Sequence, residues 1–165
     1  MQHNGDAGEA VKSGIPSDLT FDIYSGADRE SVLDLMRAFY VEDGHDFIAE
    51  IAERGLIQLE QLDALAGLWV LRRRGETRGY ICITYGFSLE VGGLDFFIDE
   101  LFVVPDARGA GVGLRALDFA ERESRARGAM RLVLEVEREN QRARDLYLQR
   151  GYAAHGRHLM SKLLA

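Results

Sequence analysis

The chain has 165 residues, of which 47% are hydrophobic and 28% are charged, and its formal net charge is −7. This length and composition predict one globular domain with a hydrophobic core of its own. The negative charge argues against general nucleic-acid binding, which needs a basic face. It reflects either a solvated acidic surface or a preference for a cationic small substrate. The sequence contains no apolar run that approaches the roughly 18 residues of a membrane span.

The N-terminal segment, residues 1–18, is polar and lacks the apolar centre of a signal peptide. We therefore expect a flexible tail ahead of a single domain over residues 19–165, in a cytoplasmic protein. Cys82 is the only cysteine, so a disulfide within the chain is excluded, and its apolar neighbours favour a buried structural thiol over a nucleophile. The histidines do not have metal-ligand spacing, so no metal site is expected.

The first part of the domain shows one strand pattern and two helix patterns. Residues 19–25 alternate apolar and polar side chains, which is the period of a half-buried strand. Apolar side chains then recur at helical spacing from Val32 to Phe39, and the sequence EDGHD ends that helix. A second helical region is predicted from Ile48 to Ala66.

Three strand-like runs follow. Residues 68–73 and 80–87 are separated by a short polar gap, Gly75-Glu76-Thr77, which is a hairpin signal. A longer connection, SLEVGGLD, leads to the third run over residues 96–104, which Pro105 ends. The three runs are predicted to form an antiparallel meander.

The last third of the chain alternates helices and strands. A glycine-rich loop opens a helix that ends at Gly128, and residues 130–136 read as a strand. A short helix lies between Asn140 and Gly151, which are typical start and stop residues, and residues 157–164 are predicted to supply a last strand. The order of elements predicts one α/β (or α+β) domain in which helices cover a mixed, mostly antiparallel sheet.

The loop DARGAGVGLRAL, residues 106–117, carries three glycines at alternate positions, where the backbone can approach a ligand closely. It is not a nucleotide P-loop, because no lysine follows the glycines. It satisfies the dinucleotide pattern G-x-G-x-x-G/A, with Glu135 about 20 residues further on. However, the residues PDAR separate the glycines from the strand, and too few parallel strands flank the loop. A tight strand-to-helix turn that binds no ligand is another interpretation of the three glycines.

With Arg108 included, the motif is R-x-x-G-x-G, placed between an apolar strand and a helix. Backbone N–H groups and the positive end of the helix dipole form an anion cradle at such a place. The chain resembles the GNAT superfamily of N-acetyltransferases, in which this motif binds the pyrophosphate of acetyl-CoA. The resemblance extends over residues 19–165. It includes the block N-x-x-A-x-x-L-Y-x-x-x-G-[FY] at Asn140, Ala143, Leu146, Tyr147, Gly151 and Tyr152.

The resemblance implies which residues bind acetyl-CoA. Backbone groups at the end of the 96–104 strand would pair with the pantetheine arm, and the glycine loop would hold the pyrophosphate. The implied cofactor-binding residues are Leu101, Phe102, Val103, Val104, Arg108, Gly109, Ala110, Gly111, Val112, Gly113, Asn140, Ala143 and Tyr147. Arg108 would either add charge at the pyrophosphate or pair with surface carboxylates. Asn140 would cap its helix and also contact the cofactor.

Acetyl transfer from a thioester to an amine needs a neutral amine and a proton for the departing thiolate. Tyr147 matches the family tyrosine that gives this proton, since a phenol with a pKa of about 10 is protonated at neutral pH. Asp99 and Glu100 compete for the role of base. Neighbouring residues of a regular strand point to opposite faces, so only one can line the acceptor site unless a bulge re-aims them. Glu100 is the first choice, because the apolar Phe96 and Phe102 are expected on its face and raise its pKa.

Tyr85, Ser88 and Glu90, together with Glu100, lie where members of the family line the acceptor pocket. Aromatic side chains and carboxylates together suit a cationic amine. The expected function is direct transfer of an acetyl group from acetyl-CoA to a primary amine of a small cationic molecule, with no nucleic-acid or membrane partner. A non-catalytic acyl-CoA-binding module and a protein N-terminal or lysine acetyltransferase are the alternatives. A homodimer that covers an exposed edge strand is compatible with the fold.

Overall fold

The computed structural model describes residues 18–109 and 111–164. Most of the predicted tail, residues 1–17, therefore lies outside the described residues, as does Ala110 of the glycine loop. The chain divides into two compact units, one that ends at Leu134 and one that begins at Glu135.

The first unit is built on a five-stranded sheet with the strand order β1-β2-β3-β4-β5. The first four strands pair antiparallel and β5 pairs parallel to β4, which confirms the predicted mixed, mostly antiparallel sheet. The strands are β1 (Leu19–Ile23), β2 (Ala66–Arg73), β3 (Glu76–Ser88), β4 (Gly93–Val103) and β5 (Arg131–Leu134).

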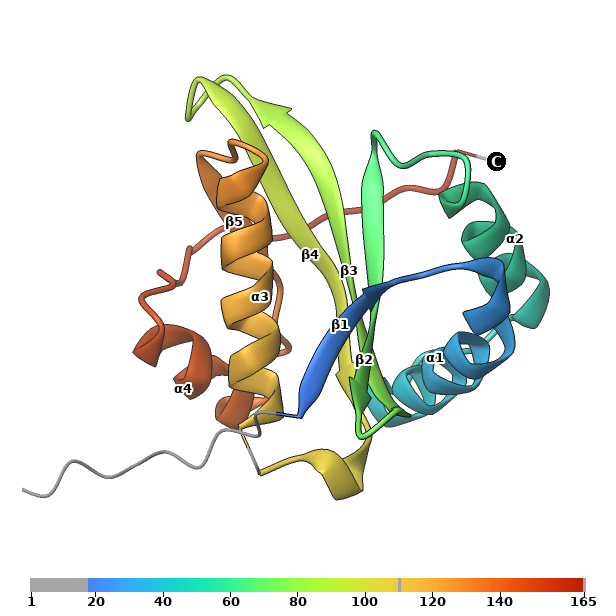
Figure 1. The fold of residues 1–165 in the computed structure, drawn as a ribbon. Helices are drawn as coiled ribbons and strands as arrows, with labels where there is room; N and C mark the ends of the chain where they lie inside the picture. Colours follow the sequence, from blue (N-terminus) through green and yellow to red (C-terminus); the bar gives the residue numbers. More distant parts are fainter. Residues whose placement is uncertain (1–17, 110, 165) are drawn as a thin grey trace, which may run out of the picture. The chain divides into compact units, whose positions relative to one another are not determined.

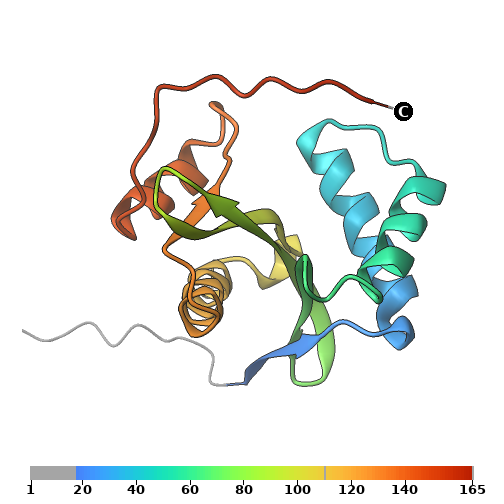
Figure 2. The same cartoon turned by 90° about the horizontal axis from the view of Figure 1, so that it is seen from above.

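Three helices cover the two faces of this sheet. Helices α1 (Arg29–Asp43) and α2 (Ala49–Leu59) lie on one face, and α3 (Val112–Ala126) lies on the other (Figures 1 and 2). Short 3₁₀ turns at Gly26–Asp28 and Pro105–Ala107 lead into α1 and into the glycine loop. Among the described helices, none has the length and apolar character that crossing a membrane requires.

Alternation along the strands gives each face of the sheet its own core. Leu68 and Val70 of β2 pack with α1 and α2, whereas the intervening Trp69 contacts Phe119 of α3, with ring centroids 5.2 Å apart. Phe21 of β1 stacks on the same Phe119 ring at 4.4 Å. Burial of both faces explains why the strands of the predicted meander are nearly continuous apolar runs.

A β-bulge interrupts the alternation in β4. Cys82 of β3 pairs with Glu100 and the next residue pairs with Ile98, so Asp99 is an extra residue in β4. The bulge puts Phe96 on the α3 face and Glu100 on the α1 face. The expectation that Glu100 shares its face with Phe96 is therefore wrong, whereas the expectation for Phe102 is confirmed, because Phe102 belongs to the core cluster under α1.

Three predicted boundaries also differ from the structure. Helix α2 ends at Leu59, because residues from Ala66 onward pair with β3 instead of continuing the helix. The connection between β3 and β4 is shorter than expected, since the two strands extend toward each other until Gly93 pairs with Ser88. The predicted last strand at residues 157–164 is not formed, because an apolar stretch alone does not supply a neighbouring strand with which to pair.

The second unit contains helix α4 (Gln141–Gln149). The Asn140 side chain accepts a hydrogen bond from the Ala143 backbone N–H at 3.1 Å, so the predicted N-cap is confirmed. The chain leaves the helix through Gly151, whose φ of +88° is in the left-handed region that favours glycine.

Candidate active site

Two phenols from different elements hold the carboxylate of Glu100. Tyr40, in the last turn of α1, donates to Oε1 at 2.7 Å, and Tyr80, in β3, donates to Oε2 at 2.6 Å. Tyr80 is fully buried, and both Glu100 and Tyr40 are partly buried. Each oxygen of Glu100 is therefore fixed by one hydrogen bond.

The bulged residue Asp99 is exposed, and none of the described residues donates a hydrogen bond to its carboxylate. Burial is the main cause that raises the pKa values of Cys82, Tyr40 and Glu100, and the negative charge of Asp99 raises them further. The charge of Asp99 thus acts on the same cluster as Glu100. Partial desolvation by the surrounding protein also raises the pKa of Asp99 itself.

Burial is the main cause that raises the pKa of Glu100, and the charge of Asp99 acts in the same direction. The hydrogen bonds from Tyr80 and Tyr40 lower this pKa and offset part of the effect. The balance leaves Glu100 with a pKa above its usual range. A carboxylate tuned upward in this way is a better proton acceptor at neutral pH than an exposed one.

The two carboxylates of the bulge have no basic partner among the described residues. Other acidic side chains of the same unit do have one. Asp95 accepts from Arg131 at 2.8 Å, and Asp28 is bonded by Arg72. A partly buried carboxylate without a countercharge is unfavourable unless a cation reaches it. The site therefore presents two acidic side chains that have no countercharge among the described residues.

Cys82 faces the same cluster. Burial, with the charges of Asp99 and Glu100, raises the pKa of its thiol to about 12. The thiolate is therefore disfavoured at neutral pH, which supports the prediction of a structural thiol. The described residues contain no group of three His, Cys, Asp or Glu side chains that could hold a metal ion.

The last residues of β4 are hydrogen-bonded to a neighbouring strand along one edge only. Its ladder with β5 stops at the pair Ile98–Leu134, whereas β4 itself continues to Val103 and stays paired with β3. Val104 still donates to the carbonyl of Arg78 at 2.9 Å. Beyond Ile98, the edge of β4 that faces away from β3 has no strand partner among the described residues.

The glycines of the loop follow β4 after the short 3₁₀ turn Pro105–Ala107. Gly109 has a φ of +83°, and Gly111, the N-cap of α3, has a φ of +77°. Gly113 lies in the first turn of α3 with an ordinary helical φ, and a Cβ there would meet nothing within 4 Å. Neither backbone strain nor internal packing therefore requires a glycine at Gly113. Val112 begins the helix and is buried.

The Arg108 side chain makes three hydrogen bonds within the protein. Its guanidinium makes a bidentate pair with Glu42, at 2.7 and 2.6 Å, and its Nε donates to the Val103 carbonyl at 2.8 Å. The guanidinium also lies 5.5 Å from the centre of the Phe102 ring. Of the two roles expected for Arg108, pairing with a carboxylate is the one that this structure contains.

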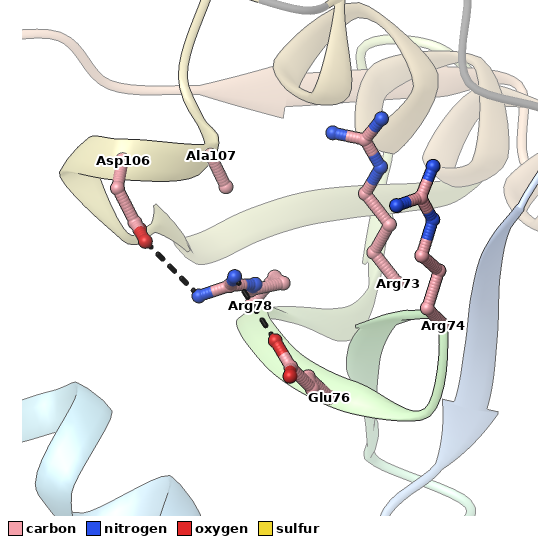
Figure 3. A pocket seen from close by; sticks show the side chains of 6 residues that line it. All are labelled: Arg73, Arg74, Glu76, Arg78, Asp106 and Ala107. Carbon is pink, nitrogen blue, oxygen red and sulfur yellow. Dashed lines mark hydrogen bonds and ion pairs between the residues drawn. The ribbon is translucent and has the colours of Figure 1, made fainter.

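A shallow hollow of about 240 Å³ lies beside the start of the loop and is lined by Arg73, Arg74, Glu76, Arg78, Asp106 and Ala107. Figure 3 shows Arg78 between its two acidic partners, Glu76 at 3.0 Å and Asp106 at 3.1 Å. Arg73 and Arg74 both pair with Asp18. The arginines of this hollow are therefore neutralised by neighbouring carboxylates.

The structure does not bring the residues expected in the acceptor pocket together with Glu100. Tyr85 lies on the α3 face, with its ring 4.6 Å from Phe96 and 4.8 Å from the guanidinium of Arg127. Ser88 and Glu90 are at the β3–β4 turn, about 20 Å along the strand from Cys82. Glu90 pairs there with Arg131 at 3.2 Å.

The sequence reasoning did not identify Tyr40 and Tyr80 as site residues. Tyr80 stands at the start of the apolar run YICITYGF, and that pattern predicts only that it belongs to a strand. Tyr40 follows Met36 at a spacing of one helical turn, which could have placed it on the face of α1 that meets the sheet. Tyr147 lies in α4 of the second unit, where its ring is 5.8 Å from that of Tyr152.

The family model described as "Acetyltransferase (GNAT) family" matches residues 29–152 of the chain. A curated relative, "Uncharacterized N-acetyltransferase YhfO" of Bacillus subtilis, is 36% identical over 83 residues, which make up 50% of this chain and 56% of that protein. The chain thus spans about half the length of this curated relative.

Solved structures share the fold over most of the chain. An integron cassette protein from a salt-marsh metagenome superposes with a TM-score of 0.78 and 30% identity, over 95% of this chain and 97% of that one. A predicted acetyltransferase from Clostridium acetobutylicum, solved with acetyl-CoA, gives a TM-score of 0.73 and 16% identity, over 88% and 97% of the two chains. With a family model that matches well over half of its length, the chain belongs to the acetyltransferase (GNAT) family.

Proposed function

We propose that this protein transfers the acetyl group of acetyl-CoA directly to a primary amine of a small cationic molecule. The observation that carries the proposal is that β4 holds both parts such a reaction needs. Its bulge presents two carboxylates without a basic partner, and its free edge leads into the glycine loop at the N-terminus of α3. Membership of the GNAT family supports the same reaction.

In this proposal the backbone from Leu101 to Val104 orients the pantetheine arm along the free edge of β4. Loop N–H groups from Gly109 to Gly113 bind the pyrophosphate, helped by the dipole of α3. Acetyl-CoA, with which the Clostridium acetobutylicum neighbour was solved, supplies an activated acetyl group as a thioester. The open space beside Gly113 fits such a ligand, because a side chain there would stand where phosphate oxygens approach. Asn140 and Ala143, at the start of α4, remain proposed contacts of the cofactor.

Glu100 is the proposed general base. Its raised pKa and its fixed orientation suit it to take a proton from the acceptor ammonium, which leaves a neutral amine able to attack. Asp99 adds negative charge beside it and is the alternative base. Tyr147 is the proposed general acid that returns a proton to the departing thiolate. The nitrogen loses its second proton once the C–N bond has formed, and this proton replaces the one that Tyr147 gives to the thiolate as the C–S bond breaks. Glu100 then releases its proton to solvent, so both side chains return to their starting states.

The preference for a cationic acceptor rests on charge. Glu100 and Asp99 lack a basic partner among the described residues, and an ammonium group supplies the missing countercharge. The phenol ring of Tyr40 adds aromatic surface near the carboxylates, whereas the ring of Phe47, 5.9 Å from it, is already covered by the guanidinium of Arg37 at 5.0 Å. Aromatic faces stabilise a neighbouring cation.

The test is release of free thiol from acetyl-CoA by wild-type protein and by Glu100→Gln, Asp99→Asn and Asp34→Asn variants. Removal of a general base lowers the rate by about 10²-fold or more, so Glu100→Gln is expected to lose kcat while acetyl-CoA still binds. Asp34 pairs with Arg37 on the exposed side of α1, so its variant is a matched control that keeps full activity. Full activity of Glu100→Gln together with inactivity of Asp99→Asn would assign the base to Asp99. Full activity of both would refute a carboxylate base in the bulge.

A further inference from the structure

The two hydrogen bonds on Glu100 are short. Their lengths, 2.6 Å from Tyr80 and 2.7 Å from Tyr40, lie near the range of O–H···O bonds to an ionised carboxylate, about 2.5–2.7 Å. Each carboxylate oxygen has two acceptor positions, and a phenol fills one of them. Each oxygen therefore keeps one position at which an amine proton can be received.

The two phenols are held in different ways. Tyr80 is 0% exposed, and its ring lies 6.4 Å from that of Phe102 in the core cluster under α1. Tyr40 is partly buried and is packed edge-on by Phe39 at 5.8 Å and by Phe47 at 5.9 Å. Neither ring can move away from Glu100 without losing these contacts.

Both phenols remain hydrogen-bond donors over the pH range in which a carboxylate titrates. Burial raises the pKa values of Tyr40 and Tyr80 well above the ordinary tyrosine value, and the charge of Glu100 raises them further. A neutral phenol that donates to a carboxylate stabilises its ionised form. The phenols therefore oppose the effect of burial on Glu100.

The geometry points to Tyr40 and Tyr80 as positioning residues that fix the orientation of the Glu100 carboxylate and keep it ionised in its partly buried site. This inference rests on the proposed function, in which Glu100 receives the proton of the acceptor amine. A glutamic acid that stayed protonated at neutral pH could not take that proton, and a freely rotating carboxylate would meet the amine less often.

The groups that face Glu100 from the neighbouring elements shift its pKa in opposite directions. Tyr40 from α1 and Tyr80 from β3 lower the pKa of Glu100 through their hydrogen bonds, whereas Asp99 of β4 raises it through its charge. Cys82 of β3 is the other titratable group there, and its thiol stays protonated. Removal of a phenol must therefore raise the pKa of Glu100, and removal of the Asp99 charge must lower it.

The first experiment titrates Glu100 directly, by NMR of ¹³C-labelled glutamate carboxyl groups in the whole protein without substrate. The missing signal in Glu100→Gln identifies the resonance. A hydrogen bond to a charged group corresponds to a shift of about 1–2 pH units, so the midpoint should rise by about that amount in Tyr40→Phe and in Tyr80→Phe. It should fall in Asp99→Asn. Tyr24→Phe is the matched control, because the Tyr24 phenol donates to a different glutamate, Glu60, at 3.3 Å.

The second experiment measures kcat/KM against pH for the same variants. The acidic limb of the kcat/KM profile should move to higher pH in Tyr40→Phe by the amount that NMR gives for the Glu100 midpoint. Much of the wild-type kcat/KM should be recovered on the alkaline side. A merely structural role would lower the plateau and leave the limb where it is.

An unchanged Glu100 midpoint in Tyr40→Phe would overturn the inference. If Tyr80→Phe does not fold, Tyr40→Phe and Asp99→Asn still decide it through their opposite shifts. If the wild-type protein turns over no amine, the proposed function fails, whereas the NMR midpoints still show whether the phenols hold Glu100 ionised. The two failures are thus distinguishable.

Discussion

Glu42 and Arg108 form a bidentate ion pair that joins the last turn of α1 to the first residue of the R-x-x-G-x-G motif. Tyr40, which donates to Glu100, belongs to the same helical turn. One turn of α1 therefore contacts both the proposed base and the loop that is proposed to bind pyrophosphate.

This ion pair predicts how acetyl-CoA affinity responds to the charge of Glu42. In Glu42→Gln the guanidinium of Arg108 loses its neutralising partner, so the positive potential at the loop rises. We expect acetyl-CoA to bind severalfold more tightly at low salt, with a smaller gain at high salt because exposed charges are screened. Calorimetric titration at two ionic strengths checks this, with Asp34→Asn as the control. Weaker binding of Glu42→Gln would show instead that the pair holds the loop in its binding shape.

Gly113 allows binding to be separated from folding. Replacement of glycine by alanine inside a helix stabilises it by about 0.5–1 kcal/mol, and a Cβ at Gly113 meets no atom within 4 Å. We expect Gly113→Ala to unfold at the same or a higher temperature and yet to bind acetyl-CoA at least tenfold more weakly. Gly55→Ala in α2, where a Cβ also meets nothing, should show the gain in stability alone. Unchanged affinity of Gly113→Ala would argue against phosphate contact at this position.

Tyr147→Phe tests the proposed general acid. The variant keeps the ring that packs against Tyr152 and removes only the hydroxyl. We expect kcat to fall by about 10²-fold, because the leaving thiolate loses its proton donor, while the KM for acetyl-CoA stays nearly the same. Steady-state kinetics measure both values, and an unchanged kcat would remove Tyr147 from the mechanism.

Glu100 should also affect stability in a pH-dependent way. Its pKa in the folded protein lies above the ordinary value of 4.5, chiefly because of burial, so its favourable contribution exists at low pH and is lost as the pH rises through the raised value. Glutamine does not titrate. The Tm of Glu100→Gln relative to wild type should therefore increase between about pH 4 and about pH 8, by about 2–4 °C for each kcal/mol. A constant difference, measured by calorimetry, would contradict the raised pKa.

The regular parts of the fold were predictable because one local pattern decides each of them. Apolar runs separated by turn signals gave the meander, and Asn140 and Gly151 gave the ends of α4. The bulge at Asp99 was not predictable, since it depends on how β3 and β4 pair, and it moved Phe96 to the opposite face from Glu100. The strand predicted at residues 157–164 is absent for a related reason, since the local sequence does not determine which strand a segment can pair with.

The candidate site was predictable only where its chemistry lies in contiguous sequence. The loop from Arg108 to Gly113 and the acidic pair at the end of β4 stand in one stretch of chain. Tyr40 is 60 residues away from Glu100 along the sequence. Only the packing of α1 on the sheet brings the Tyr40 hydroxyl to 2.7 Å from Oε1 of Glu100. Tyr85 was expected beside the acceptor, but strand alternation carries it to the α3 face, next to Arg127.

The most direct test of the central claim is the release of free thiol from acetyl-CoA by the wild-type protein with a panel of acceptors. The panel contains polyamines, other small amines, amino acids, aminoglycosides and peptides with free N-termini, and mass spectrometry identifies the acetylated product. We predict turnover of at least one small cationic amine, with little on the peptides. Stabilisation by acetyl-CoA without turnover of any acceptor would contradict the claim and indicate a binding module. Stabilisation by NAD alone would contradict the cofactor itself.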